Sequence, residues 1–104
     1  MKTKRTALIT GASSGLGVEY AKLCAADGHD VVLVARSEGK LRELARELSQ
    51  KHGITAHVYP ADLSRADGPR GLFDALARDG VTVDILVNNA GLGYVSDFRS
   101  STTA

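Results

Sequence analysis

The sequence has little cysteine, almost no net charge and no long apolar run, and each shortage excludes a class of protein. Cys24 is the one cysteine among 104 residues, so no internal disulfide can form, which is typical of a reducing compartment. A formal net charge of +1 argues against a nucleic-acid-binding surface. No apolar stretch is long enough to span a bilayer, and the N-terminus lacks a secretory signal. These absences predict a cytoplasmic protein with no nucleic-acid or membrane partner.

A length of 104 residues suits one modest domain with a single core. No repeat, linker or low-complexity block interrupts the chain. We therefore expect one domain over residues 1–104. Residues 92–104 have little apolar content, so we expect them to be poorly ordered.

Strand-like and helix-like patterns alternate along the chain. Short apolar runs predict strands at 6–10, 31–35, 54–59 and 84–88. Helical periodicity predicts helices near 14–27, 37–52 and 72–79, and in the first of these the predicted buried positions are Leu16, Tyr20, Leu23 and Cys24. Such alternation with short connections predicts an α/β fold with a parallel, doubly wound sheet.

The second predicted helix has a clear apolar stripe and a candidate cap. Ser37 could cap its N-terminus. Its predicted buried stripe is Leu41, Leu44, Ala45 and Leu48. The charged residues of this helix lie off the stripe, so we interpret them as a solvated face.

A glycine-rich turn follows the first predicted strand. Gly11, Gly15 and Gly17 are spaced by four and two residues, just before a helical pattern begins. Glycine tolerates a positive φ and lets a ligand approach the main chain. The first N–H groups of the next helix, with the positive end of its dipole, would point into this turn. The turn therefore predicts an anion site that suits a phosphate.

The residues after this turn exclude one kind of nucleotide site. A P-loop requires a lysine and a serine or threonine directly after its last glycine, whereas Gly17 is followed by Val18 and Glu19. The common dinucleotide fingerprint spaces its glycines by two and three. The turn in this chain would bind a phosphate in the same way, through glycines and a helix N-terminus, but with a different glycine spacing.

Two motifs together resemble the short-chain dehydrogenase/reductase family. The pattern Thr-Gly-x-x-x-Gly-x-Gly over residues 10–17 resembles its cofactor motif, and the Asn-Asn-Ala-Gly run at 88–91 resembles its second motif. The resemblance covers nearly the whole chain. It implies a Rossmann-like sheet, here incomplete, with four strands in the order 3-2-1-4. It also implies hydride transfer between a nicotinamide cofactor and an alcohol or carbonyl substrate, whose identity the sequence does not reveal.

The same resemblance implies where the cofactor binds. The implied residues lie in the glycine turn, at the end of the second strand, and after the third and fourth strands: Gly11, Ser13, Ser14, Gly15, Leu16, Gly17, Arg36, Asp62, Leu63, Asn89, Ala90 and Gly91.

The end of the second strand favours NADP over NAD. Ala35 stands where family members that select NAD usually carry an acid, and Arg36 offers fixed donors to a 2′-phosphate. The alternative is that Arg36 is a surface cation. Many relatives that select NADP also carry a basic residue where this chain has Ser14.

Two further positions keep a structural alternative. Asp62 and Leu63 match the segment that hydrogen-bonds the adenine in the family, but Asp62 could equally cap the next segment, with Ser64 and Asp67 as other caps. For Asn88 we expect a structural role that braces the central strands.

The catalytic residues implied by the family are absent. Its acid is a tyrosine with a lysine four positions later, whereas Tyr20, Tyr59 and Tyr94 have no such partner. We assign no catalytic residue and no metal ligand. Two hypotheses follow: the chain is the NADP(H)-binding portion of such an oxidoreductase, truncated or interrupted, or it is a non-catalytic nucleotide-binding or interaction module.

The incomplete sheet also predicts an exposed edge. In the family, strands continue beyond the fourth, so Ile85, Leu86 and Val87 would form an open, apolar edge. We expect the isolated chain to be aggregation-prone, to self-associate through that edge, or to lie within a larger assembly that completes the sheet.

Overall fold

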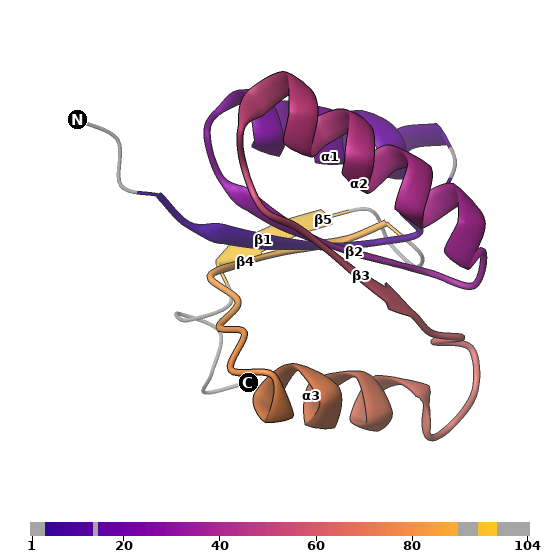
Figure 1. Ribbon diagram of the computed structural model, residues 1–104. Helices are drawn as coiled ribbons and strands as arrows, with labels where there is room; N and C mark the ends of the chain where they lie inside the picture. Colours follow the sequence, from indigo (N-terminus) through magenta and orange to yellow (C-terminus); the bar gives the residue numbers. More distant parts are fainter. Residues whose placement is uncertain (1–3, 14, 90–93, 98–104) are drawn as a thin grey trace.

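A five-stranded sheet lies between two layers of helices in the computed structural model, which describes residues 4–13, 15–89 and 94–97. The elements in chain order are β1 (Thr6–Thr10), α1 (Gly15–Ala26), β2 (Asp30–Ala35), α2 (Glu38–His52), β3 (Ala56–Pro60), α3 (Gly68–Arg78), β4 (Ile85–Asn88) and β5 (Tyr94–Asp97). Figure 1 shows α1 and α2 on one face of the sheet and α3 on the other.

The strand order is β3-β2-β1-β4-β5, and the pairs among the first four strands are parallel. The predicted Rossmann-like α/β fold and the order 3-2-1-4 are therefore confirmed. All four parallel strands run in one direction, so their carboxyl ends meet at a single edge of the sheet.

The predicted open edge on β4 is wrong. Residues 94–97 form β5, which pairs antiparallel with β4 and places Val95 opposite Val87. Pairing of this kind uses main-chain hydrogen bonds, which a segment of low apolar content can also form. Self-association through β4 loses its basis, and β5 is a part of the 92–104 tail that is ordered into a strand. Residues 92–93 and 98–104 lie outside the described residues.

The fully buried residues of α1 are small, which corrects half of the predicted stripe, since Tyr20 and Cys24 are partly buried against the core. Gly17, Ala21 and Ala25 are buried, whereas the side chains of Leu16 and Leu23 are 63% and 66% exposed. The start of the helix lies so close to the preceding turn that a Cβ on Gly17 would overlap the main chain of Gly11. Small residues at intervals of four thus face the core, and Leu16 and Leu23 point outward.

The cysteine of α1 is a packing residue. Cys24 is partly buried against the cluster between the sheet and α1 and α2. Burial raises the pKa of its thiol, and the negative charge of Asp27 adds to the rise. A thiol that is held protonated is a poor nucleophile.

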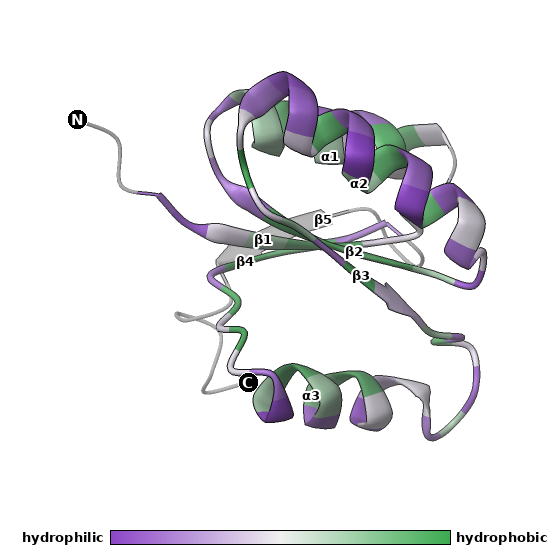
Figure 2. Cartoon of the chain, viewed as in Figure 1, coloured by the Kyte–Doolittle hydropathy of each residue, from purple (hydrophilic) through white to green (hydrophobic). Residues whose placement is uncertain are grey.

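Strand β2 lies near the centre of the sheet and is buried on both faces. Val31 and Leu33 point into the cluster beneath α1 and α2, and Val32 and Val34 point into the cluster beneath α3. The stripe predicted for α2 is confirmed, because its buried residues are Leu41, Leu44, Ala45 and Leu48. Figure 2 shows this arrangement as green helix surfaces turned toward the sheet.

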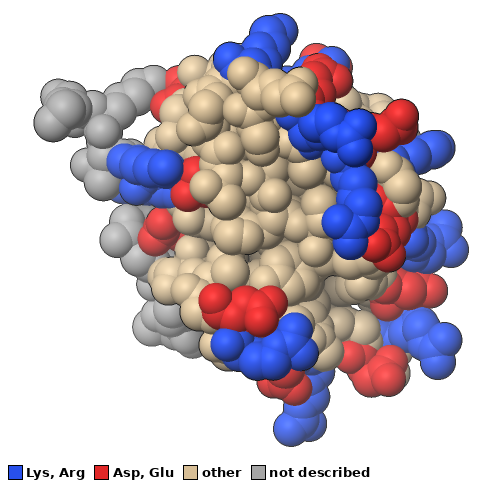
Figure 3. Space-filling view, in the orientation of Figure 1, with Lys and Arg blue, Asp and Glu red and all other residues tan. Residues whose placement is uncertain are grey.

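The outer surface carries charges of both signs. On the face in Figure 3, acidic and basic side chains lie interspersed, and an uncharged area lies between them. One pair on α2 joins Glu38 and Arg42 at helical spacing. Within the described ranges, no helix is both long and apolar enough to cross a membrane.

Candidate functional site

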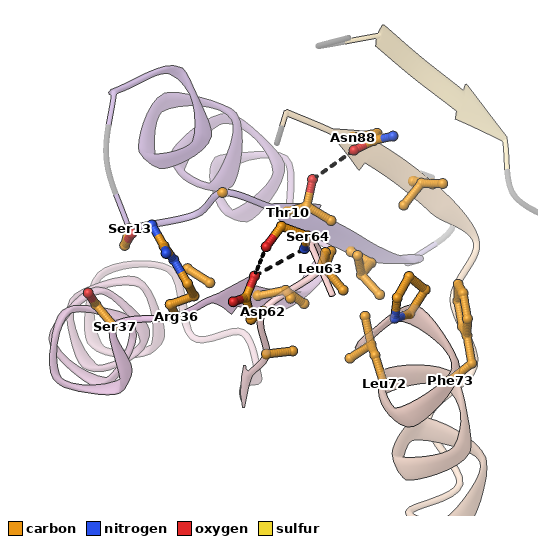
Figure 4. Close-up of a pocket in the computed structure, with 17 residues that line it drawn as sticks. Thr10, Ser13, Arg36, Ser37, Asp62, Leu63, Ser64, Leu72, Phe73 and Asn88 are labelled. Carbon is orange, nitrogen blue, oxygen red and sulfur yellow. Dashed lines mark hydrogen bonds between the residues drawn. The ribbon is translucent and has the colours of Figure 1, made fainter. Parts of the chain in front are cut away.

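A pocket of about 750 Å³ lies at the carboxyl ends of the parallel strands. Ends of β1, β2 and β4 and the segment after β3 form its walls, and α3 adds an apolar wall through Pro69, Leu72 and Phe73. This is the point where the chain order reverses, between β1 and β4, and open α/β sheets bind ligands at such a point. Figure 4 shows side chains from these separate elements gathered around it.

The turn between β1 and α1 has the geometry of an anion site. Gly11 and Gly15 have φ values of 64° and 54°, in the left-handed region that favours glycine. A Cβ on Gly17 would overlap the carbonyl oxygen of Gly11, so a glycine there lets the start of α1 pack against the turn. Leu16 is 63% exposed and does not line the pocket, so any contact with a ligand would come from its main-chain N–H at the start of α1. Ser14 lies outside the described residues.

Hydrogen bonds fix this turn to β2 and β4. The N–H of Ala12 donates to the carbonyl oxygen of Val34 at 3.1 Å, and Nδ2 of Asn89 donates to the carbonyl oxygen of Gly11 at 3.4 Å. The Thr10 hydroxyl donates to Oδ1 of Asn88 at 3.1 Å. The bracing role predicted for Asn88 is thereby confirmed. The side chain of Asn89 is engaged with the glycine turn, and Ala90 and Gly91 lie outside the described residues.

Arg36 lies at the rim of the pocket with its charge available. It follows Ala35, the last residue of β2, which is buried, and Arg36 itself is exposed. It forms no ion pair with the described part of the chain, and its positive charge helps to lower the pKa of Asp62 across the pocket. A guanidinium without an ion-pair partner in the described chain can bind an anionic group.

Ser37 also lines the pocket, which the sequence reasoning missed. Ser37 occupies the N-cap position predicted for it, but its side chain forms no capping hydrogen bond. Its carbonyl oxygen accepts from the N–H of Leu41 at 3.1 Å. The signal was its position, directly after Arg36 and before a helix start.

One carboxylate oxygen of Asp62 accepts the hydrogen bonds that close a local turn. Its Oδ1 accepts from the main-chain N–H of Ser64 at 3.0 Å and from the Ser64 hydroxyl. The side-chain hydrogen bond from Ser64, followed by the main-chain one, holds the pKa of the Asp62 carboxyl below its ordinary value. Oδ2 accepts no hydrogen bond from the described residues. Asp62 therefore closes a local turn, while Asp67 holds the N-cap position of α3 without a side-chain hydrogen bond. The second oxygen of Asp62 is left for a ligand.

Five of the predicted residues are brought together in this pocket: Gly11, Ser13, Arg36, Asp62 and Leu63. Gly15, Leu16 and Gly17 build the helix start beside it. Within residues 4–13, 15–89 and 94–97, no group of three or more His, Cys, Asp or Glu side chains gathers that could hold a metal ion.

A family model described as short chain dehydrogenase matches residues 5–104. The chain belongs to the short-chain dehydrogenase/reductase family. It is 47% identical over 85 residues to a probable NADP-dependent dehydrogenase of Dichelobacter nodosus, and the alignment covers 82% of this chain and 76% of that protein.

Solved structures that are similar to this chain have the same fold. The L-sorbose reductase of Gluconobacter frateurii, in complex with NADPH and L-sorbose, gives a TM-score of 0.80 at 34% identity over 96% of this chain. A short-chain dehydrogenase of Sphingobium yanoikuyae in complex with NADPH gives a TM-score of 0.75 at 41% identity over 94% of this chain.

This short-chain dehydrogenase/reductase chain matches only part of several relatives. It spans 38% of each of those two structures and 26% of an uncharacterized oxidoreductase of Mycobacterium bovis to which it is 46% identical.

The apolar wall from α3 was missed for a physical reason. Glycines and a proline at the predicted start of this helix obscured where it begins, so its first turn was not assigned. In the structure α3 begins at Gly68 with Pro69 in its first turn, where a missing N–H costs no hydrogen bond. That start brings Pro69, Leu72 and Phe73 to the pocket.

Proposed function

We propose that the chain binds NADP(H) in this pocket and forms the cofactor-binding portion of an oxidoreductase that transfers hydride between NADP(H) and an alcohol or carbonyl substrate. The observation that carries the proposal is the exposed Arg36 at the pocket rim, following Ala35, where an acid would favour NAD. The NADPH complexes of the two similar structures and the NADP-dependent Dichelobacter relative support it.

Three parts of the pocket fit three parts of the dinucleotide. The turn at Gly11 and the N-terminus of α1 suit the pyrophosphate, because unpaired N–H groups and the helix dipole favour negative charge. Arg36 suits the 2′-phosphate, with Ser13 and Ser37 as neighbouring hydroxyl donors in the same pocket. Asp62 and Leu63 suit the adenine, through Oδ2 and a main-chain N–H.

The bound cofactor would supply the hydride, and the pocket residues would orient the cofactor. The glycine turn fixes the pyrophosphate against α1, and the segment after β3 fixes the adenine, so the dinucleotide would lie across the strand ends. Asn89 contributes by holding the carbonyl oxygen of Gly11 in place. Ser14, Ala90 and Gly91 remain part of the proposal from their motif positions alone.

A second candidate is a nucleotide-binding or interaction module without chemistry, and one observation favours it. None of Tyr20, Tyr59 and Tyr94 has a lysine four positions later. We therefore expect the 104-residue chain to show no turnover comparable to a working enzyme, about 10 s⁻¹, with NADPH and a panel of ketones. Turnover at that level would mean that another group replaces the missing acid. Because its single cysteine permits no internal disulfide, we propose that the protein works in the reducing environment of the cytoplasm.

The cofactor proposal is tested by calorimetric titration of the unmodified chain with NADPH and with NADH. The 2′-phosphate adds one charge-assisted contact to Arg36, so NADPH is expected to bind more tightly by about 1.5–3 kcal/mol. Equal affinities for the two cofactors would overturn the choice of NADP, and no binding of either would overturn the cofactor role.

A further inference from the structure

Gly68, the first residue of α3, is in direct contact with the segment that carries Asp62 and Leu63. A Cβ added to Gly68 would overlap the carbonyl oxygen of Asp62, and it would lie 3.1 Å from the carbonyl carbon of Asp62 and 3.2 Å from Cα of Leu63. All three atoms belong to the main chain, so no flexible side chain can move aside to make room.

Space, not backbone conformation, requires a glycine at this position. Gly68 is not among the residues with a positive φ, so an L-residue suffers no strain from its dihedral angles. A Cβ added to Gly71, one turn further along α3, would meet no atom of the described chain within 4 Å. The two glycines share one helix and differ in what a methyl group would meet.

The turn that Gly68 closes is tied by main-chain hydrogen bonds. The N–H of Arg65 donates to the carbonyl oxygen of Asp62 at 3.3 Å, and the N–H of Gly68 donates to the carbonyl oxygen of Arg65 at 3.1 Å. A methyl group at position 68 therefore has to push either the Asp62 carbonyl or the start of α3. Either shift changes the pocket, because Asp62 and Leu63 line one wall and Pro69 lines the next.

We propose that Gly68 is a positioning residue that sets the Asp62–Leu63 segment in register with the adenine of the bound cofactor. It touches no cofactor atom itself and acts through the main chain of Asp62. This inference rests on the proposed function, since it presupposes that an adenine lies against Asp62. Gly17 performs the same packing against Gly11 at the start of α1.

The test compares NADP⁺ with its 1,N⁶-etheno analogue, in which a bridge across the adenine removes the N6–H donor. The unmodified chain is expected to bind the etheno analogue about tenfold more weakly, because one hydrogen bond to a carboxylate is lost. In Gly68→Ala this ratio of dissociation constants should fall toward one, while NADP⁺ itself binds more weakly. Gly71→Ala, the matched control, should keep the ratio of the unmodified chain.

The ratio separates positioning from a loss of stability, since a merely destabilised chain that still folds discriminates between the two nucleotides as before. A folded Gly68→Ala variant with the unmodified ratio would overturn the inference. Binding of NADP⁺ without any discrimination by the unmodified chain would also overturn it and would leave the proposed function standing. No binding of NADP⁺ at all would overturn both.

If Gly68→Ala does not fold, an NMR titration that follows the amide signals of the unmodified chain tests the inference instead. Addition of adenosine 2′,5′-bisphosphate should shift the amide signals of Leu63 and Gly68 together, and nicotinamide mononucleotide should shift neither. A Gly68 signal that stays in place while that of Leu63 moves would overturn the inference.

Discussion

Two junctions between strand and helix face the same pocket and are built by the same packing device. The first junction, residues 11–17, joins β1 to α1, and the second junction, residues 62–68, joins β3 to α3. Each ends in a glycine, Gly17 or Gly68, whose missing Cβ lets the helix start lie against a carbonyl oxygen of the turn. The resemblance lies in the packing of main chain on main chain.

The difference lies in what each junction presents to the pocket. The first junction holds Gly11 and Gly15 with positive φ, and it exposes main-chain N–H groups at a helix start. No residue of the second junction has a positive φ, and its turn is closed by the bonds from Ser64 to Asp62. The first therefore suits an anion, and the second suits a neutral base with a donor group.

The largest effect is expected from Gly17→Ala, which breaks the first junction. The new methyl group would meet the main chain of Gly11, and overpacking of this kind typically costs about 1–3 kcal/mol. We expect a lower midpoint of urea unfolding and a loss of NADPH binding. Gly39→Ala is the control, because its Cβ meets no atom within 4 Å and a gain of about 0.4–1 kcal/mol is expected. Equal stability of the two variants would contradict the packing argument.

A second effect is expected at the rim between the two junctions. Arg36→Asp replaces an attraction to the 2′-phosphate by a repulsion, so NADPH should lose about 1.5–3 kcal/mol of binding free energy and NADH should become the tighter ligand. Arg46→Asp, which makes the same change of charge on the exposed face of α2, should leave the preference for NADPH intact. Calorimetry measures both. A variant at position 36 that still prefers NADPH would assign the 2′-phosphate to other residues.

The smallest effect is expected in the second junction, on the pKa of the Asp62 carboxyl. Hydrogen bonds from Ser64 lower the pKa of the Asp62 carboxyl below its ordinary value of 3.8. A lowered pKa in the folded chain means that the ionised carboxylate stabilises the fold above the ordinary value, and this stabilisation is lost as the pH falls through the folded pKa. Ser64→Ala keeps the main-chain donor and loses the hydroxyl, so the pKa of Asp62 should rise part of the way toward 3.8.

Titration of the Asp62 carboxyl carbon by NMR measures this pKa. Ser49→Ala, on α2, should leave it unchanged. Binding of NADPH near pH 7 should change little in Ser64→Ala, since Asp62 is ionised there in both chains. An unchanged pKa of Asp62 in Ser64→Ala would mean that the hydroxyl is not its donor.

The sequence predicted the first junction better than the second. Glycine spacing is a local pattern, so the turn followed from it, and the family resemblance implied the strand order and the role of Arg36. The role of Gly68 did not, because it depends on a contact with Asp62 that only the folded chain creates. The prediction that Leu16 and Leu23 lie on the inward face of α1 was wrong for a related reason, whereas Tyr20 and Cys24 do pack against the core. Periodicity marks Leu16 and Leu23 as candidates, but the distance between helix and sheet decides which residues fit.

The central claim is that both junctions hold one NADP(H) molecule. Amide hydrogen exchange of the unmodified chain, with and without NADPH, tests it most directly. We predict slower exchange in the presence of NADPH at the first junction, at the residues after Arg36 and at Leu63, with no change on the outer face of α2. NADH should give weaker protection at Arg36. Protection confined to one junction, or found on α2 instead, would contradict the account.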